Sequence, residues 1–183
     1  MRWVAMMLAL GLAGCAAVPP APDQKAATPD SETWTLQGRL SIRSGEQSLS
    51  GSVRWAHAAA TDTLLLTSPL GQGVARIAVT PTGVTLELPD QPVRHASDAE
   101  SLTRDALGYE LPVSGLVWWV RGQAAPASPA ETRLRDDGRL AQLRQQGWII
   151  DYLQYSGDGL PRKLSATRDG MEIRLVTDNW ARE

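Results

Sequence analysis

The sequence predicts a mainly β protein, a single antiparallel sheet of about ten or eleven strands with two short helices in the middle of the chain. Three observations predict it. Hydrophobic and polar residues alternate with period two through much of the chain after residue 33, as they do in half-buried strands. Turn-forming Gly, Pro and Asp residues separate these segments at short intervals, which favours antiparallel neighbours. Helical spacing is confined to residues 97–120, whereas a βαβ fold needs a helix between successive strands.

The first half of the chain predicts five strands. Hydrophobic residues alternate with polar ones from Trp34 to Arg43, and the alternation resumes after Gly45 to end at Trp55. The hydrophobic faces of the two segments match, so they are expected to pair as a hairpin. Three further strands are expected, over residues 63–67, 74–79 and 84–88.

The middle of the chain predicts the two helices. Ser97 and Glu100 have the spacing of a capping box, in which each side chain accepts a hydrogen bond from a free backbone N–H at the start of a helix. Gly108 is suited to end that helix. A second, shorter helix is expected over residues 113–120, after Pro112. It is hydrophobic nearly all round, so it needs cover on more than one side.

The last third of the chain returns to strands after a loop expected at residues 122–130. The dipeptides Asp137-Gly138 and Asp169-Gly170 are typical of tight hairpin turns. A curled sheet that holds the helices against its concave side fits this order of elements. The strands expected here cover residues 132–135, 139–145, 148–155, 164–168 and 171–176.

The N-terminus predicts a lipoprotein. Residues 1–14 contain one arginine and a hydrophobic stretch that is too short to span a membrane, as in a cleaved signal peptide. The segment Leu12-Ala13-Gly14-Cys15 resembles the lipobox of bacterial lipoproteins, so Cys15 is expected to carry the lipid. The alternative is an ordinary signal peptide that a cysteine happens to follow. Residues 15–32 are expected to form the lipidated end and a flexible tether, and residues 33–183 a single domain.

Composition limits the expected cellular location of the protein and the classes of partner that it could bind. Cys15 is the only cysteine, so no disulfide can form within the chain. Ala16 is not the aspartate that the resemblance to lipoproteins associates with retention in the inner membrane, so we expect the outer membrane. The formal net charge is −2, with both signs spread along the chain, which argues against a nucleic-acid partner. We expect a monomer.

The sequence offers little for catalysis. His57 and His95 are the two histidines, and neither lies in a Gly-x-Ser-x-Gly or His-Glu-x-x-His motif. We interpret both as structural or solvated residues. A hydrolase would need one of them beside Ser68 or Ser114. The composition cannot supply the Cys and His set of a zinc site. We therefore expect no enzyme, no catalytic residue, no metal and no cofactor.

One loop is unusual because a large hydrophobic residue lies between turn formers. In Ser68-Pro69-Leu70-Gly71-Gln72, the leucine is placed at the junction of two expected strands. The sequence around it is equally compatible with an exposed functional leucine and with a leucine buried under its own loop.

Nearly the whole body of the chain resembles the LolB family of outer-membrane lipoprotein receptors. No single motif is specific, but their order and spacing together are. The matching residues are Trp34, Gly38-Arg39, Trp55, Leu64-Leu65-Leu66, Ser68-Pro69-Leu70-Gly71, Leu111-Pro112, Leu116, Trp119, Gly122, Gly147-Trp148, Tyr152, Tyr155, Leu160-Pro161 and Asp178-Asn179-Trp180.

The resemblance implies an unclosed antiparallel β barrel of about eleven strands, with helices in its mouth over a hydrophobic cavity. It implies that the protein takes acylated lipoproteins from the periplasmic carrier LolA and inserts them into the inner leaflet of the outer membrane, without a cofactor. The exposed loop leucine of the family matches Leu70, flanked by Pro69 and Gly71, and would drive insertion. The alternative function is a lipid- or glycolipid-binding structural lipoprotein of the same fold that transfers nothing.

The residues that would line the cavity follow from the resemblance together with hydrophobic bulk. Alternation shows which residues share a face of the sheet, but not which face is concave. Packing within an ordinary core is the alternative for each of them. The candidates for contact with the acyl chains of cargo are Trp55, Leu66, Trp119 and Trp148.

Overall fold

The computed structural model describes residues 33–126 and 128–182, which contain eleven strands and two helices. The predicted signal peptide, Cys15 and the tether lie outside the described residues. In chain order the elements are β1 (Trp34–Ser44), β2 (Gln47–Ala58), β3 (Thr61–Thr67), β4 (Gly73–Thr80), β5 (Gly83–Glu87), β6 (Arg94–Ala96), α1 (Ala99–Leu107), α2 (Val113–Trp119), β7 (Ala130–Leu134), β8 (Leu140–Gln145), β9 (Trp148–Tyr155), β10 (Pro161–Arg168) and β11 (Met171–Arg182).

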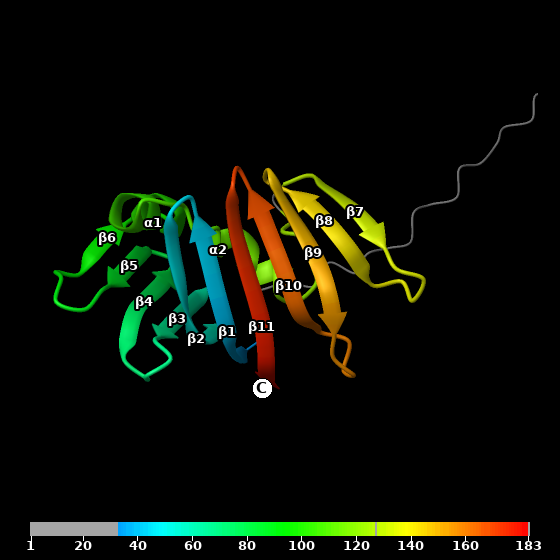
Figure 1. The fold of residues 1–183 in the computed structure, drawn as a ribbon, viewed down its shortest axis with the longest axis horizontal. Coiled ribbons are helices and arrows are strands. Elements are labelled where there is room, and N and C mark those ends of the chain that lie inside the picture. Colours follow the sequence, from blue (N-terminus) through cyan, green and yellow to red (C-terminus); the bar gives the residue numbers. More distant parts are fainter. Residues whose placement is uncertain (1–32, 127, 183) are drawn as a thin grey trace, which may run out of the picture.

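The strands form one antiparallel sheet in the order β6-β5-β4-β3-β2-β1-β11-β10-β9-β8-β7 (Figure 1). Consecutive strands are neighbours throughout each half of the chain, and the pairing of β1 with β11 joins the two halves. The sheet ends at β6 on one side and at β7 on the other, so the barrel is unclosed. The predicted fold class is therefore confirmed.

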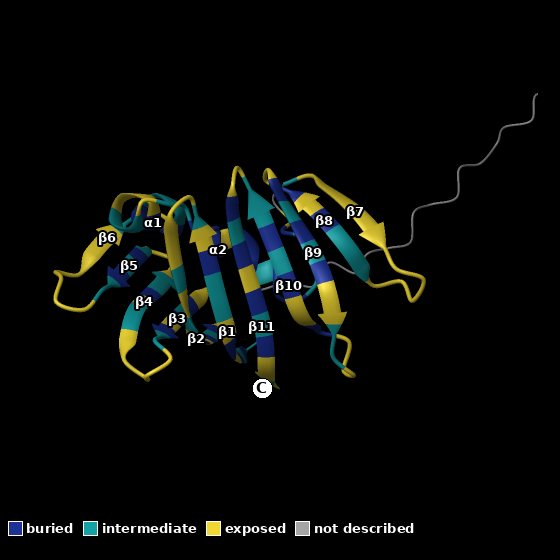
Figure 2. Ribbon diagram, in the orientation of Figure 1, coloured by how far each residue is buried: buried dark blue, intermediate teal, exposed yellow. Residues whose placement is uncertain are grey.

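Both helices lie between β6 and β7 in the chain and against one face of the sheet, which is turned away from the viewer in Figure 1. We call this the inner face. Buried and exposed positions alternate along β1 and β11 (Figure 2), as the sequence pattern predicts. Side chains of the inner face and of both helices form a single hydrophobic core. The hydrophobic second helix is covered as expected, with Val113, Gly115, Leu116 and Trp119 buried.

Most predicted strands are confirmed, with shifts at their ends. The hairpin of β1 and β2 forms as expected, and Asp169 and Gly170 have the positive φ angles, 48° and 78°, of a tight hairpin turn. Strand β6, which has three residues, was not predicted from the sequence. The end of β11 was predicted at residue 176, whereas the strand reaches Arg182 because it pairs with β1 as far as Trp34.

The predicted capping box is wrong by one residue. The N-cap of α1 is Asp98, whose carboxylate accepts a hydrogen bond of 2.7 Å from the backbone N–H of Ser101. The Glu100 carboxylate instead accepts hydrogen bonds from the N–H and hydroxyl of Ser114, at 3.0 and 2.7 Å, and so ties α1 to α2. The helix therefore starts at the predicted turn, but Asp98 caps it instead of Ser97, and Glu100 does not bond back to the cap. The C-cap is Gly108, as predicted, with φ 81°.

Replacing Asp98 by Ala should lower the free energy of unfolding by about 1 kcal/mol at neutral pH, whereas Ser97→Ala should change it little. Hydrogen bonding from the Ser101 backbone N–H lowers the pKa of the Asp98 carboxyl. The stabilisation by this ionised cap is therefore present above about pH 4 and is lost as the pH falls through the pKa of the folded state. Urea unfolding of both variants at neutral pH measures the difference, and equal losses would restore Ser97 as the cap.

Candidate functional site

The four candidate cavity residues all lie in the core between the inner face and the helices. Trp55 is on β2, Leu66 on β3, Trp119 on α2 and Trp148 on β9. The indole rings of Trp119 and Trp148 lie 6.2 Å apart, and Trp55 packs instead against Trp34, at 5.5 Å. The structure thus brings the four residues into one core, but in two aromatic groups.

This core is closed in the structure. Trp119 and Trp148 are 0% and 1% exposed, and Trp55 and Leu66 are also buried. A side chain on the wall of a void large enough for water would keep accessible area toward that void, and these side chains keep almost none. An acyl chain can therefore reach these four side chains only if the groups that cover them move.

The position of Trp119 depends on Gly115, one turn earlier on α2. A Cβ at this glycine would lie 2.5 Å from the nearest atom of the Trp119 ring, well inside van der Waals contact. The indole therefore lies flat over its own helix, and any larger residue at position 115 would push it out.

Gln145 is a buried polar residue that ties the segment after α2 to the sheet. Its side-chain oxygen accepts hydrogen bonds from the Trp119 indole N–H at 2.9 Å and from the Ala125 N–H at 2.8 Å. Its amide nitrogen donates to the carbonyl oxygens of Ala125 at 2.7 Å and Ser128 at 2.9 Å. Gln145 was not among the residues predicted from the sequence. The signal that could have found it is a glutamine at a core-facing position of β8, two residues after Leu143.

An ion network ties the linker between the helices to the turn that connects β10 and β11. The Glu110 carboxylate pairs with Arg104 on α1 through one oxygen and with Arg168 on β10 through the other. The guanidinium of Arg168 also lies 4.7 Å from the centre of the Trp148 ring, which is within cation–π range. The helices are thus held to the sheet at a second point, beside a candidate cavity residue.

Polar contacts between the end of β2 and the start of β3 explain why His57 is buried. His57 is 4% exposed, its Nδ1 lies 2.9 Å from the Asp62 carboxylate, and its ring stacks on Trp34. The same carboxylate accepts a hydrogen bond of 2.7 Å from the Trp55 indole. This arrangement fits the structural interpretation of His57, which links β2 to the start of β3.

The other residues that a hydrolase would need lie in separate places. The Ser68 hydroxyl accepts a hydrogen bond from the backbone of Gln72, and the Ser114 hydroxyl donates to Glu100. His95 is exposed on β6.

Within residues 33–126 and 128–182, no group of three or more His, Cys, Asp and Glu side chains could hold a metal ion. No helix of this described part is long and hydrophobic enough to cross a membrane.

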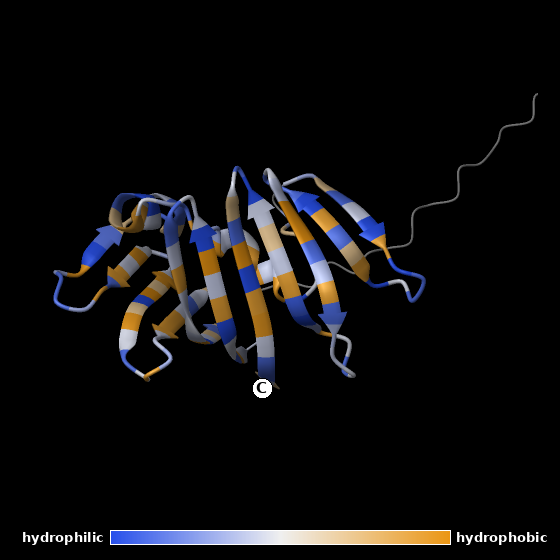
Figure 3. Ribbon diagram, viewed as in Figure 1, coloured by the Kyte–Doolittle hydropathy of each residue, from blue (hydrophilic) through white to orange (hydrophobic). Residues whose placement is uncertain are grey.

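The β3–β4 loop presents Leu70 to solvent. Leu70 is 88% exposed, the most exposed of the large hydrophobic residues in the described chain. The loop beneath it is closed by hydrogen bonds from the N–H of Ser68 to the Gln72 carbonyl and from the N–H of Gly71 to the Ser68 carbonyl. Gly71 has the positive φ, 83°, that this turn requires. Figure 3 shows the hydrophobic tip of the loop at the lower left. The alternative of a leucine buried under its own loop is therefore wrong.

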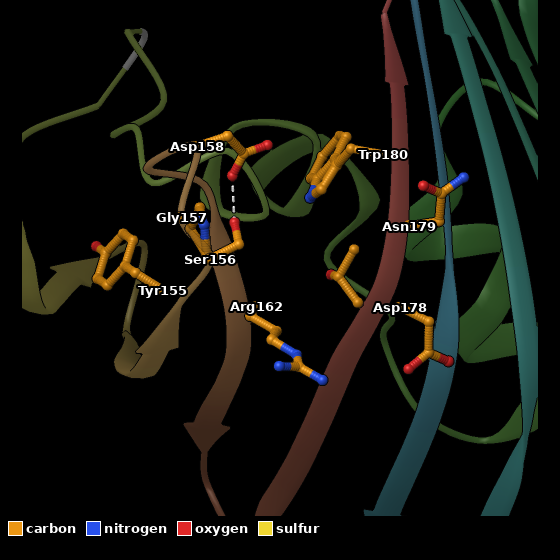
Figure 4. Close-up of a pocket in the computed structure, with 10 residues that line it drawn as sticks. Tyr155, Ser156, Gly157, Asp158, Arg162, Asp178, Asn179 and Trp180 are labelled. Atoms are coloured by element: carbon orange, nitrogen blue, oxygen red, sulfur yellow. Dashed lines mark hydrogen bonds between the residues drawn. The ribbon is translucent and has the colours of Figure 1, made fainter.

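A pocket that the sequence analysis did not anticipate lies between the β9–β10 loop and the end of β11 (Figure 4). Its volume is about 510 Å³, and Asp158, Arg162, Asp178 and Asn179 contribute polar groups to its wall. The hydroxyl of Ser156 donates to Asp158 and lowers the pKa of that carboxyl. Such a wall is unsuited to an acyl chain, because burying these charges without partners would cost more than the chain would gain. The hydrophobic core remains the candidate acyl-chain site.

Comparison with known proteins agrees with the geometry. The family model described as outer membrane lipoprotein LolB matches residues 32–180. The outer-membrane lipoprotein LolB of Thiobacillus denitrificans is 57% identical over 173 residues, covering 94% of this chain and 93% of that protein. The LolB of Nitrosomonas europaea is 38% identical over 167 residues, covering 88% of this chain and 79% of that protein.

Solved structures share the fold at low sequence identity. A putative outer membrane lipoprotein-sorting protein domain from Vibrio parahaemolyticus has a TM-score of 0.52 and 9% identity, covering 82% of this chain and 85% of that chain. A LolA superfamily protein from Nitrosomonas europaea has a TM-score of 0.50 and 8% identity, covering 82% and 86%. From the family match and the identity to curated relatives over most of its length, the chain belongs to the LolB family of outer-membrane lipoproteins, the receptors of lipoprotein localisation.

Proposed function

We propose that this protein takes acylated lipoproteins from a LolA-type periplasmic carrier, holds their acyl chains between its helices and its sheet, and inserts them into the inner leaflet of the outer membrane. The observation that carries this proposal is the cover of the inner face. Two short helices, rather than a second sheet, lie over a core rich in Trp and Leu. Such a cover can be displaced without unfolding the sheet.

The energetics of transfer support a device without a cofactor. An acyl chain of some sixteen carbons gains about 13 kcal/mol when it leaves water, at about 0.8 kcal/mol per CH₂. For the carrier to release its cargo, the site in this protein must bind the acyl chain as tightly as the carrier does or slightly more tightly. The bilayer must bind the chain more tightly than either protein. Each step then runs downhill, and the direction of transfer comes from differences between the three hydrophobic environments.

Opening of the site would break identifiable contacts in this structure. Acyl chains would replace the contacts of Trp119 and Trp148, and α2 would have to separate from Gln145 while Glu110 separates from Arg168. These hydrogen bonds and this ion pair can hold the helices against the sheet when no cargo is bound. The free energy lost when they break is small enough for the burial of one acyl chain to offset it. The closed core would thus be the empty state of the receptor.

The role of Leu70 in this proposal is to bring the mouth of the site into the lipid. Its full burial is worth about 1.5 to 3 kcal/mol, which is far too little to anchor a protein to a membrane. Exposed on a braced turn, it can enter the leaflet at the moment of release. Pro69 and Gly71 shape the turn that holds it outward.

The anchor and the site would be separable. We propose that residues 1–14 are removed and that Cys15 carries the acyl chains, joined to the body by residues 15–32 acting as a tether. A secreted Cys15→Ala protein should therefore still accept cargo from a loaded carrier, at a yield within about twofold of the anchored protein in detergent. Gel filtration of the mixture, followed by detection of the labelled cargo, measures the acceptance. Acceptance that strictly required the lipid on Cys15 would contradict this separation.

A further inference from the structure

The two edges of the sheet differ in how far other elements cover them. At one edge, β6 has three residues, and α1 packs against it. At the other edge, β7 has five residues, all of them exposed, and it pairs with β8 alone in the described part of the chain. Leu134 at its end is 58% exposed. Exposed edge strands are usually protected against pairing with another strand, for example by shortness or by charged side chains. Strand β7 is short and carries Glu131 and Arg133, so a strand that pairs with it must match this order of charges.

The register of β7 shows which way its side chains point. Ala130 lies opposite Gln145 and Thr132 opposite Leu143, and both of these β8 residues are buried in the core. Ala130 and Thr132 therefore lie on the inner face, because opposed residues point to the same side of a sheet. Glu131, one residue further along, lies on the outer face, and so does Arg133.

The edge is self-complementary in sequence. If a second copy pairs antiparallel about Thr132, Glu131 of each copy lies opposite Arg133 of the other on the outer face. The two Thr132 residues then oppose one another, and each Ala130 lies opposite a Leu134. Opposite charges and Thr pairs are favourable cross-strand neighbours, whereas like charges directly opposite are unfavourable. Neither Glu131 nor Arg133 has an ion-pair partner among residues 33–126 and 128–182.

We propose that two copies of this protein pair through β7 on the membrane, about a two-fold axis at Thr132, so that the sheets of both copies become continuous. The partner must be a strand with the charge order of β7 itself, and a second copy supplies it. Pro129 limits the pairing to the five residues of the strand, because it has no N–H to continue the ladder. The two-fold arrangement lets each copy use the same surface.

The size of this interface determines where the pairing occurs. A stable complex in solution usually buries about 800 Å² on each partner, and five residues of edge strand bury much less. The body should thus be a monomer in dilute solution, as expected from the sequence. The inference rests on the proposed anchor at Cys15, since tethering to one membrane surface raises the effective concentration of one copy around another.

The test uses the full lipidated chain reconstituted in phospholipid vesicles. Thr132→Cys should give a disulfide-linked dimer under mild oxidation, since the Thr132 positions of the two copies would be directly opposed. Thr82→Cys, on the exposed β4–β5 turn, is the matched control and should give at least about fivefold less dimer. Equal dimer from both variants would overturn the proposal, since it would reflect random collision on the membrane.

Charge reversal distinguishes pairing of this strand with itself from other contacts. In the Thr132→Cys background, Arg133→Glu places two glutamates opposite one another, and Glu131→Arg places two arginines. Each should reduce the dimer at least about fivefold. The double variant restores both pairs in reversed order, so its dimer should return to within about twofold of the starting level. A double variant that stays as low as the single ones would contradict the proposal, as would a link formed only to added LolA-type carrier. Release of labelled cargo, measured alongside, tests the proposed function separately.

Discussion

Replacing Leu70 by Glu should leave folding and the acceptance of cargo intact but slow delivery to vesicles at least about tenfold. The leucine is exposed and its loop is held by backbone hydrogen bonds that do not involve its side chain, so the variant has no reason to unfold. If Leu70 enters the lipid in the transition state of release, its loss removes about 1.5 to 3 kcal/mol of burial. That corresponds to a delivery rate about 10 to 150 times lower, and the glutamate adds a charge that resists insertion.

A matched control separates the loop from general surface hydrophobicity. Leu153 on β9 is 51% exposed, and Leu153→Glu makes the same chemical change on another surface. Labelled lipoprotein is loaded onto each variant and mixed with vesicles, and the cargo that sediments with the lipid is followed in time. Normal delivery by Leu70→Glu, or an equal defect in Leu153→Glu, would remove the loop from the mechanism.

Replacing Gln145 by Leu should lower the free energy of unfolding by about 3 kcal/mol. The leucine fills a similar volume, but it leaves the Trp119 indole N–H and the N–H and carbonyl of Ala125 without their buried partners. Each unsatisfied buried group costs about 1 to 3 kcal/mol, and relaxation toward water at the helix end recovers part of the total. In a domain of this size, the melting temperature should fall by roughly 6 to 12 °C.

Gln142→Leu is the control for this variant. Gln142 lies on the same strand and donates to Asp151 in a part-buried contact that water can still reach, so its loss should cost less than the loss of Gln145, about 1 kcal/mol. Denaturant unfolding of both proteins gives the comparison. The Gln145 variant should also take up a fluorescent fatty acid faster, since one tie between α2 and the sheet is lost. Wild-type stability in Gln145→Leu would show that this glutamine does not hold the helices closed.

The parts of the fold that the sequence predicted are those governed by local pattern. Alternation of hydrophobic and polar residues predicted the long strands. Turn-forming residues such as Gly170 predicted where those strands end. Strand β6 was not predicted because its three residues, Arg94, His95 and Ala96, are too few to show an alternation. The pairing with β5 and the contact with α1 determine the structure of that segment. The end of β11 was missed for a similar reason. Asp178 and Asn179 interrupt the hydrophobic pattern, yet the long β1 beside them continues the ladder.

The candidate site was predictable only in part. Hydrophobic bulk together with the family resemblance selected Trp119 and Trp148, which the structure brings together in the core. Their closure by Gln145 and by the pair of Glu110 and Arg168 depends on residues far apart in the chain, and no local pattern joins them. The exposure of Leu70 likewise follows from hydrogen bonds within the loop, which the composition of the loop allows but does not require.

The most direct test of the proposed receptor function follows one labelled lipoprotein through both transfers without ATP. The cargo is first bound to a purified LolA-type carrier, then mixed with the secreted Cys15→Ala body, and vesicles of outer-membrane phospholipid are added last. We expect the label to move from the carrier to this protein and then to the vesicles. Label that stays on the carrier while this protein binds free lipid would contradict it, and would instead favour a structural lipid-binding lipoprotein.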